Sequence, residues 1–146
     1  MNMSKLMDIV FICSSIAFNI LVSVLYIATK LGNMALVQVC GAIVLSLIIP
    51  FTVTLLGYMK EKAEKRTIIS HVFILFYLFL ELSLDYILKI PFREILTIHV
   101  PYIIVFYAAM FSMIGVSFDK NRKMGFVVTT TFLTLIGCLT YYLLPF

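Results

Sequence analysis

Long apolar runs alternate with short polar gaps along the whole chain. Five runs consist almost entirely of apolar residues, and they are Leu6–Ala28, Met34–Met59, Thr67–Leu88, Ile95–Phe118 and Phe126–Leu144. A helix needs about 20 residues to cross a hydrocarbon core of about 30 Å, so each run is long enough to span a membrane. The runs are continuously apolar and lack the period of two that is typical of membrane barrels. The pattern therefore predicts an all-α fold, a polytopic integral membrane bundle of five transmembrane helices.

The composition agrees with this interpretation. Hydrophobic residues make up 63% of the 146 residues and charged residues 12%, and the mean hydropathy is +1.13. A soluble domain of this size could not bury so much apolar surface. Because little chain remains outside the runs, we expect residues 1–146 to form a single transmembrane helical domain in a lipid bilayer. The expected location is the plasma (cytoplasmic) membrane.

The first apolar run resembles a secretory signal in its position only. It is longer than the apolar region of a signal peptide, and the segment Tyr26-Ile27-Ala28 lacks a small-x-small cleavage site. We therefore expect a retained first helix.

The basic residues are distributed unequally between the two sides of such a bundle. With five spans, eight Lys and Arg residues lie on the side of the N-terminus: Lys5, Lys60, Lys62, Lys65, Arg66, Lys120, Arg122 and Lys123. Only Lys30, Lys89 and Arg93 lie on the other side. Since basic loops remain in the cytoplasm, the N-terminus is predicted inside and the C-terminus outside. The net charge of +4 is explained by this topology, and no nucleic-acid partner is expected.

Three prolines predict irregularities in the helices. Pro50 lies inside the second run, where its missing N–H favours a kink. Pro91 is expected to end the third helix and to force a tight turn. Pro101 is expected to begin the fourth span proper, with Glu94–Val100 forming an interfacial turn before it.

An acidic pair inside the third run is the most costly feature of the sequence. Glu81 and Asp85 are four residues apart, so both carboxyl groups lie on one helical face. A charged acid at the centre of a membrane helix costs about 2.5–3.5 kcal/mol on insertion scales, and such residues usually face the bundle interior or a wet cavity. Repulsion between the two carboxylates also favours binding of a proton or a cation. The pair therefore marks the candidate site.

Further polar residues are expected at similar depth in the outer half of the bilayer. Tyr77 shares the helical face of Glu81, and a rise of about 1.5 Å per residue places polar groups from three other runs nearby. The predicted ligand-binding set is Glu81, Asp85, His99, Tyr102, Asn19, Gln38 and Tyr77. His71, near the inner end of the third run, is expected among the lipid headgroups.

Each of these residues also has a purely structural interpretation. Asp85 can pair with Lys89 one turn away, and Glu81 with Asn19 or a tyrosine. Asn19 and Gln38 are of a type that often forms hydrogen bonds between membrane helices. His99, beside a proline near a helix start, is typical of an interfacial residue. The sequence alone leaves both interpretations open.

No sequence motif identifies a chemistry. The cysteines Cys13, Cys40 and Cys138 lie inside apolar runs without Cys-x-x-Cys spacing, which favours packing over disulfides or a thiol redox centre. No cofactor and no dedicated metal site are predicted. The His-Glu-x-x-His and Gly-x-Ser-x-Gly signatures of enzymes are absent from the sequence.

Three functions remain open. The first is transporter-like binding of a proton, a metal cation or a small organic cation, for which a homo-oligomer or a partner subunit is expected because five helices form a thin bundle. The second is an intramembrane enzyme that uses Glu81, Asp85 and His99 as metal ligands or as acid and base. The third is an accessory or assembly subunit whose acids pair with a partner's basic residues.

Overall fold

The computed structural model describes residues 3–88 and 95–144, with side chains described except at positions 3, 4, 85 and 86. The elements in chain order are α1 (Met3–Leu31), α2 (Met34–Ser46), α3 (Ile48–Lys60), α4 (Lys65–Glu81), the π-helix η1 (Leu82–Ile87), α5 (Leu96–Lys120) and α6 (Arg122–Leu143). No strand occurs within these two ranges.

Five helical segments are long and apolar enough to cross a membrane. They are Lys5–Leu31, Met34–Lys60, Lys65–Leu84, Leu96–Lys120 and Arg122–Leu143. This confirms the predicted all-α membrane bundle and its five spans. Large apolar side chains that face outward occur on every span, including Leu56, Phe76, Ile104 and Leu133. Such an apolar exterior is typical of an integral membrane protein.

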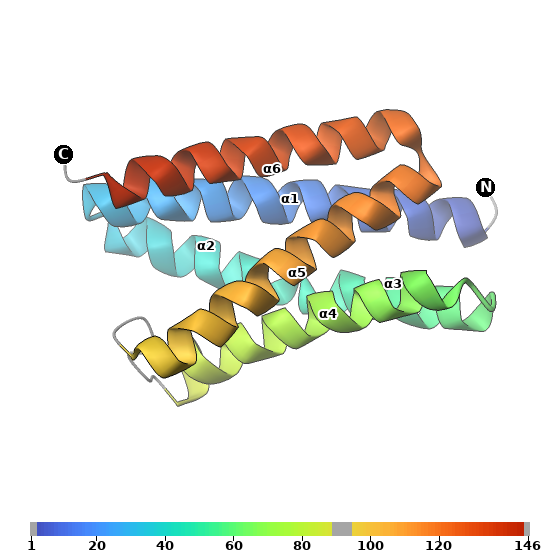
Figure 1. The fold of residues 1–146 in the computed structure, drawn as a ribbon, viewed down its shortest axis with the longest axis horizontal. Coiled ribbons are helices and arrows are strands. Elements are labelled where there is room, and N and C mark those ends of the chain that lie inside the picture. The colour runs from blue at the N-terminus through green and yellow to red at the C-terminus, as the bar shows by residue number, and fades with distance from the viewer. Residues whose placement is uncertain (1–2, 89–94, 145–146) are drawn as a thin grey trace.

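Helix α1 lies at the centre of the bundle. It packs along α6 over most of its length and also contacts α2, α3 and α5, while α4 packs against α3 and α5. Figure 1 shows α1 and α6 side by side, with α5 crossing the molecule diagonally toward the far end of α4. We call the end that holds the α1–α2 turn, η1 and the last turn of α6 the C-terminal end, and the opposite end the N-terminal end.

The second span is interrupted at Leu47, which separates α2 from α3. Pro50 has no N–H to donate to the carbonyl of Ser46, and its ring crowds the same turn. The N–H of Leu47 therefore bonds to the Val44 carbonyl at 3.1 Å, three residues back, before the regular pattern resumes. The predicted irregularity at Pro50 is present, and it lies one turn before the proline.

Pro101 does not open the fourth span, so that expectation is wrong. Helix α5 begins at Leu96 and contains Pro101. Pro101 has no N–H to donate to the carbonyl of Thr97 and its ring crowds that carbonyl, but α5 continues through it. Pro91 lies outside the described residues, and so does Glu94, the first residue of the predicted interfacial turn.

Candidate functional site

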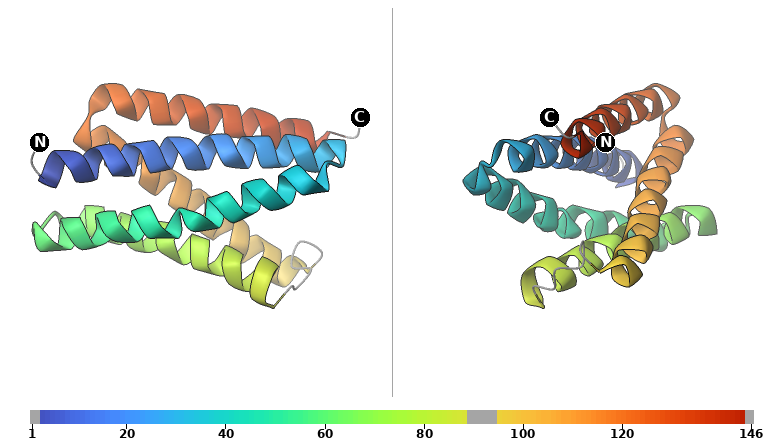
Figure 2. Two further views of the ribbon diagram at one scale, coloured as in Figure 1. Left: turned by 180° about the vertical axis from the view of Figure 1, so that it is seen from behind. Right: turned by 60° about the vertical axis from the view of Figure 1, so that its left-hand side comes forward.

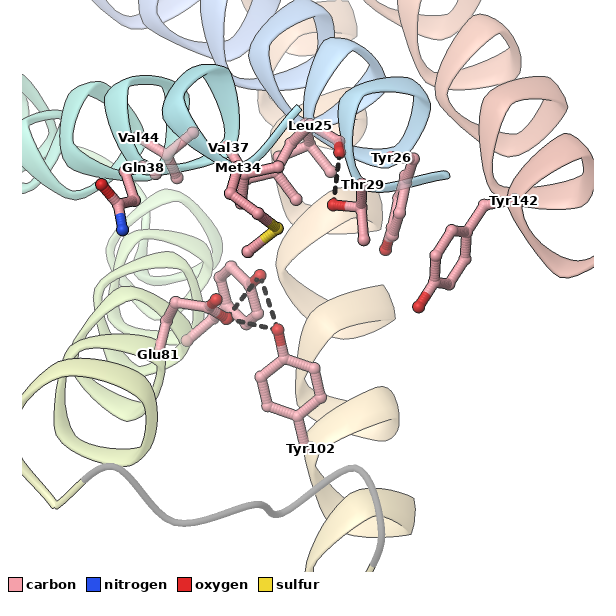
Figure 3. Close-up of a pocket in the computed structure, with 13 residues that line it drawn as sticks. Leu25, Tyr26, Thr29, Met34, Val37, Gln38, Val44, Glu81, Tyr102 and Tyr142 are labelled. Carbon is pink, nitrogen blue, oxygen red and sulfur yellow. Dashed lines mark hydrogen bonds between the residues drawn. The ribbon is translucent and has the colours of Figure 1, made fainter. Parts of the chain in front are cut away.

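A cavity of about 440 Å³ lies at the C-terminal end of the bundle. Residues from five helices line it, and they are Val22, Leu25, Tyr26, Thr29, Met34, Val37, Gln38, Gly41, Val44, Tyr77, Glu81, Tyr102 and Tyr142. Glu81 carries the only formal charge among these lining residues. The cavity thus combines one acid with four tyrosines and a largely aliphatic wall (Figure 3).

The acid is held by two tyrosine hydroxyl groups. Tyr77 donates a hydrogen bond of 3.1 Å to Oε2 of Glu81, and Tyr102 donates a short hydrogen bond to the same oxygen. The two hydroxyl oxygens also lie 3.1 Å apart. In Figure 3, Glu81 and Tyr102 point toward each other across the cavity from α4 and α5. Two hydroxyl donors to one oxygen suit a carboxylate that carries negative charge.

Local helix geometry explains why these groups meet. Tyr77 and Glu81 are four residues apart on α4 and therefore lie on one face. The ring of Tyr77 packs edge-on against Phe18 at 5.8 Å and against Phe106 at 5.3 Å between ring centroids, which fixes its hydroxyl group near Tyr102. The α-helix ends at Glu81 itself and continues as the π-helix η1. Single π-helical turns are frequent at functional sites.

The opposite wall of the cavity is apolar and aromatic. Leu25 of α1 and Val37 and Val44 of α2 form part of it. The rings of Tyr26 and Tyr142 lie 5.6 Å apart between their centroids and face the same space (Figure 3). A ligand with a positive charge at one end and apolar atoms elsewhere would match these two walls.

The structure brings four of the seven predicted site residues together. Glu81, Tyr77, Tyr102 and Gln38 all line the cavity. His99 does not line it, although its ring stacks on that of Tyr102 with centroids 6.2 Å apart.

The two remaining predicted residues lie elsewhere. Asn19 faces α6, where its amide group donates to Thr131 at 2.9 Å and to the Val128 carbonyl at 3.4 Å. This is the interhelical hydrogen bonding that the structural interpretation expected. Asp85 lies outside the described side chains, so the acidic pair stays a prediction.

Sequence reasoning missed part of the cavity wall. Tyr26, Thr29, Met34 and Tyr142 line the cavity but are not among the predicted site residues. Tyr26 lies four residues after Val22 and three before Thr29, so helical spacing places all three on one face of α1. This spacing is the signal by which the sequence could have identified Tyr26 and Thr29 as residues of one wall.

A second polar cluster occupies the N-terminal end. His71 is fully buried there, between Phe11 and Tyr58, and its Nε2 lies 3.1 Å from the hydroxyl oxygen of Thr54. Tyr58 donates a 2.5 Å hydrogen bond to Asp8, which the sequence analysis overlooked. His71 is thus enclosed by aromatic side chains inside the bundle, and its predicted depth at the level of the lipid headgroups stays a prediction.

The two clusters are separated by an apolar layer. Phe18, Phe51, Ile74, Leu78 and Met110 are all buried between them. Ten residues separate His71 from Glu81 on one continuous helix, which corresponds to about 15 Å. In this structure the cavity at Glu81 is thus closed toward the N-terminal end.

The described side chains do not form a metal centre. No group of three or more His, Cys, Asp or Glu residues within them lies close enough to hold an ion. The three residues proposed as metal ligands of an enzyme, Glu81, Asp85 and His99, include Asp85, whose side chain is not among those described. That metal site therefore stays a prediction.

Comparisons of the chain with protein-family models, with curated proteins and with solved structures found no match.

Proposed function

We propose that this membrane protein binds a small organic cation in the cavity at Glu81, in a transporter-like role. The observation that carries the proposal is the Glu81 carboxylate, held by the hydroxyl groups of Tyr77 and Tyr102 on the wall of a 440 Å³ cavity. A carboxylate attracts a cation, and the surrounding tyrosine rings add cation–π attraction once water is excluded.

The size and lining of the cavity favour an organic cation over a proton or a metal ion. A volume of about 440 Å³ lies in the range of small-molecule sites. A metal ion would prefer several oxygen or nitrogen ligands at about 2.0–2.6 Å, whereas the lining contains one carboxylate and many apolar groups. The two hydroxyl donors preorganise the carboxylate, which lowers the cost of binding.

The test is cation binding by the purified protein in lipid nanodiscs. Calorimetric titration with tetraethylammonium is expected to give saturable binding, and Glu81→Gln is expected to weaken it at least about tenfold, since about 1.4 kcal/mol of lost attraction has that effect. Glu64→Gln is the matched control, because Glu64 is an exposed acid next to the start of α4, at the other end of the bundle. Equal affinity of wild type and Glu81→Gln would remove the basis of the proposal.

The orientation of the cavity follows from the basic residues and is part of the same proposal. Eight of the eleven Lys and Arg residues belong to the N-terminus and to the two loops on the same side of the bundle. Since basic loops stay in the cytoplasm, the cavity at the other end is expected to open outward. In a variant with its three cysteines replaced, Asn33→Cys should react with a membrane-impermeant maleimide on intact cells. Lys62→Cys should react only after permeabilisation. The reverse pattern would place the cavity on the cytoplasmic side.

A further inference from the structure

Among the described residues, α2 and α4 lie on two sides of the cavity without packing on each other. Helix α2 packs on α1 and α3, and α4 packs on α3 and α5, whereas α2 and α4 share at most marginal contact. Both views in Figure 2 show α2 and α4 apart toward the C-terminal end. Residues of both helices nevertheless line the same cavity. Gln38 of α2 lines the cavity and is also exposed, so the cavity reaches the outside of the bundle beside α2, and we call this place between α2 and α4 the opening.

The interruption at Leu47 accounts for this opening. Helix α3 packs on both α1 and α4, whereas α2, on the other side of the break, packs on α1 and shares at most marginal contact with α4. The break at Leu47 thus divides the span into a half that packs on α4 and a half that does not. The separation of α2 from α4 is built into the sequence of the second span.

A polar side chain stands at the opening. Gln38 lines the cavity from α2 and is exposed, while its neighbours Val39 and Ile43 face the exterior as apolar side chains. In the part of the chain that the structure describes, Gln38 makes no hydrogen bond. It lies four residues into α2, about 6 Å along the helix from its start. An amide at the opening suits the polar head of a molecule that moves in from the leaflet.

The chemistry of the two walls completes the argument. The α4 and α5 side offers Glu81 with its two tyrosines, and the α2 side offers Val37, Val44 and other apolar atoms that continue to the opening. A cation that carried an alkyl or aryl tail could place its charge at Glu81 and leave the tail along α2 in the acyl-chain region. A fully hydrophilic cation would use only one of the two walls.

We propose that the ligand is an amphiphilic cation that enters the cavity from the bilayer between α2 and α4. This inference rests on the proposed cation site and specifies its ligand class and entry route. The charged head binds at Glu81, Gln38 contacts the head during entry, and the tail packs along the apolar side chains of α2.

The first experiment compares two ligands with the same head. Binding of tetramethylammonium and dodecyltrimethylammonium to wild type and Glu81→Gln is measured in nanodiscs, with protein-free nanodiscs correcting for partition into lipid. The tailed cation is expected to bind at least tenfold more tightly after correction, and only when Glu81 is present. Equal corrected affinities would overturn the amphiphile inference and leave the cation site intact. Loss of Glu81 dependence for both ligands would instead overturn the cation site itself.

The second experiment locates the entry route. The chain contains no Trp, so Gln38→Trp introduces a single fluorophore at the opening. Brominated phosphatidylcholine is expected to quench it strongly, and dodecyltrimethylammonium is expected to relieve that quenching by displacing lipid from the opening. Val39→Trp, one residue away on the exposed apolar face, should be quenched without relief. Quenching of Gln38→Trp by aqueous acrylamide but not by brominated lipid would show that the opening faces water, and would overturn entry from the bilayer.

Discussion

Replacement of Glu81 by Ala is expected to weaken binding of organic cations at least about tenfold and to lower the melting temperature, whereas Glu81→Gln should weaken binding to a similar extent without lowering the melting temperature. Alanine removes the acceptor to which both Tyr77 and Tyr102 donate. A buried polar group that loses its partner costs about 1–3 kcal/mol. The carbonyl oxygen of a glutamine side chain can still accept from the hydroxyl groups, so only the charge is lost.

Thermal unfolding of the three proteins in one detergent measures this difference. As a control, Tyr77→Phe and Tyr102→Phe are added to Glu81→Ala, which removes the donors together with the acceptor and should recover most of the lost stability. Tyr107→Phe tests for unspecific effects, because Tyr107 does not line the cavity. A Glu81→Gln protein that melts far below wild type would mean that the charge itself holds a structural partner, and would contradict the ligand-site interpretation.

The spans were predictable because the bilayer imposes a simple requirement on sequence. Apolar runs of sufficient length between charged gaps predicted five spans, and the ends of all five agree with the structure within four residues. What the pattern could not show is where a span packs. The position of the break at Leu47 and the different partners of α2 and α3 depend on contacts with α1 and α4, which are distant in sequence.

The candidate site was predictable where a single helix determines it. The cost of Glu81 in lipid and the spacing of Tyr77 placed both on an inward face, and the structure joins them to Tyr102 and Gln38. Depth alone did not decide which neighbouring residues share a cavity. Asn19 was expected near the level of Glu81, but the rotation of α1 turns it toward α6, where Thr131 accepts its hydrogen bond. Rotation about a helix axis is set by packing between helices, which one sequence does not reveal.

Close packing at the α5–α6 turn is likewise not visible in the sequence. From this packing we predict that Gly125→Ala destabilises the protein. A single residue, Asn121, joins the two helices, and its side chain accepts hydrogen bonds from the N–H groups of Lys123 and Met124. A Cβ atom at position 125 would lie 2.5 Å from the ring of Phe118 and 2.9 Å from its Cα atom. The backbone at Phe118 cannot move away without opening the turn. Overpacking of this kind typically costs about 1–3 kcal/mol.

Two other glycines provide matched controls for this prediction. At Gly57 a Cβ atom would meet only Sδ and the flexible side chain of Met7, and at Gly137, also on α6, it would meet nothing within 4 Å. Gly57→Ala should therefore cost little, and Gly137→Ala should be neutral or gain up to about 1 kcal/mol from the higher helix propensity of alanine. Thermal unfolding in detergent measures all three variants. If Gly125→Ala melts at the wild-type temperature, the close approach of α6 to Phe118 is not required for stability, and the turn must relax at no cost.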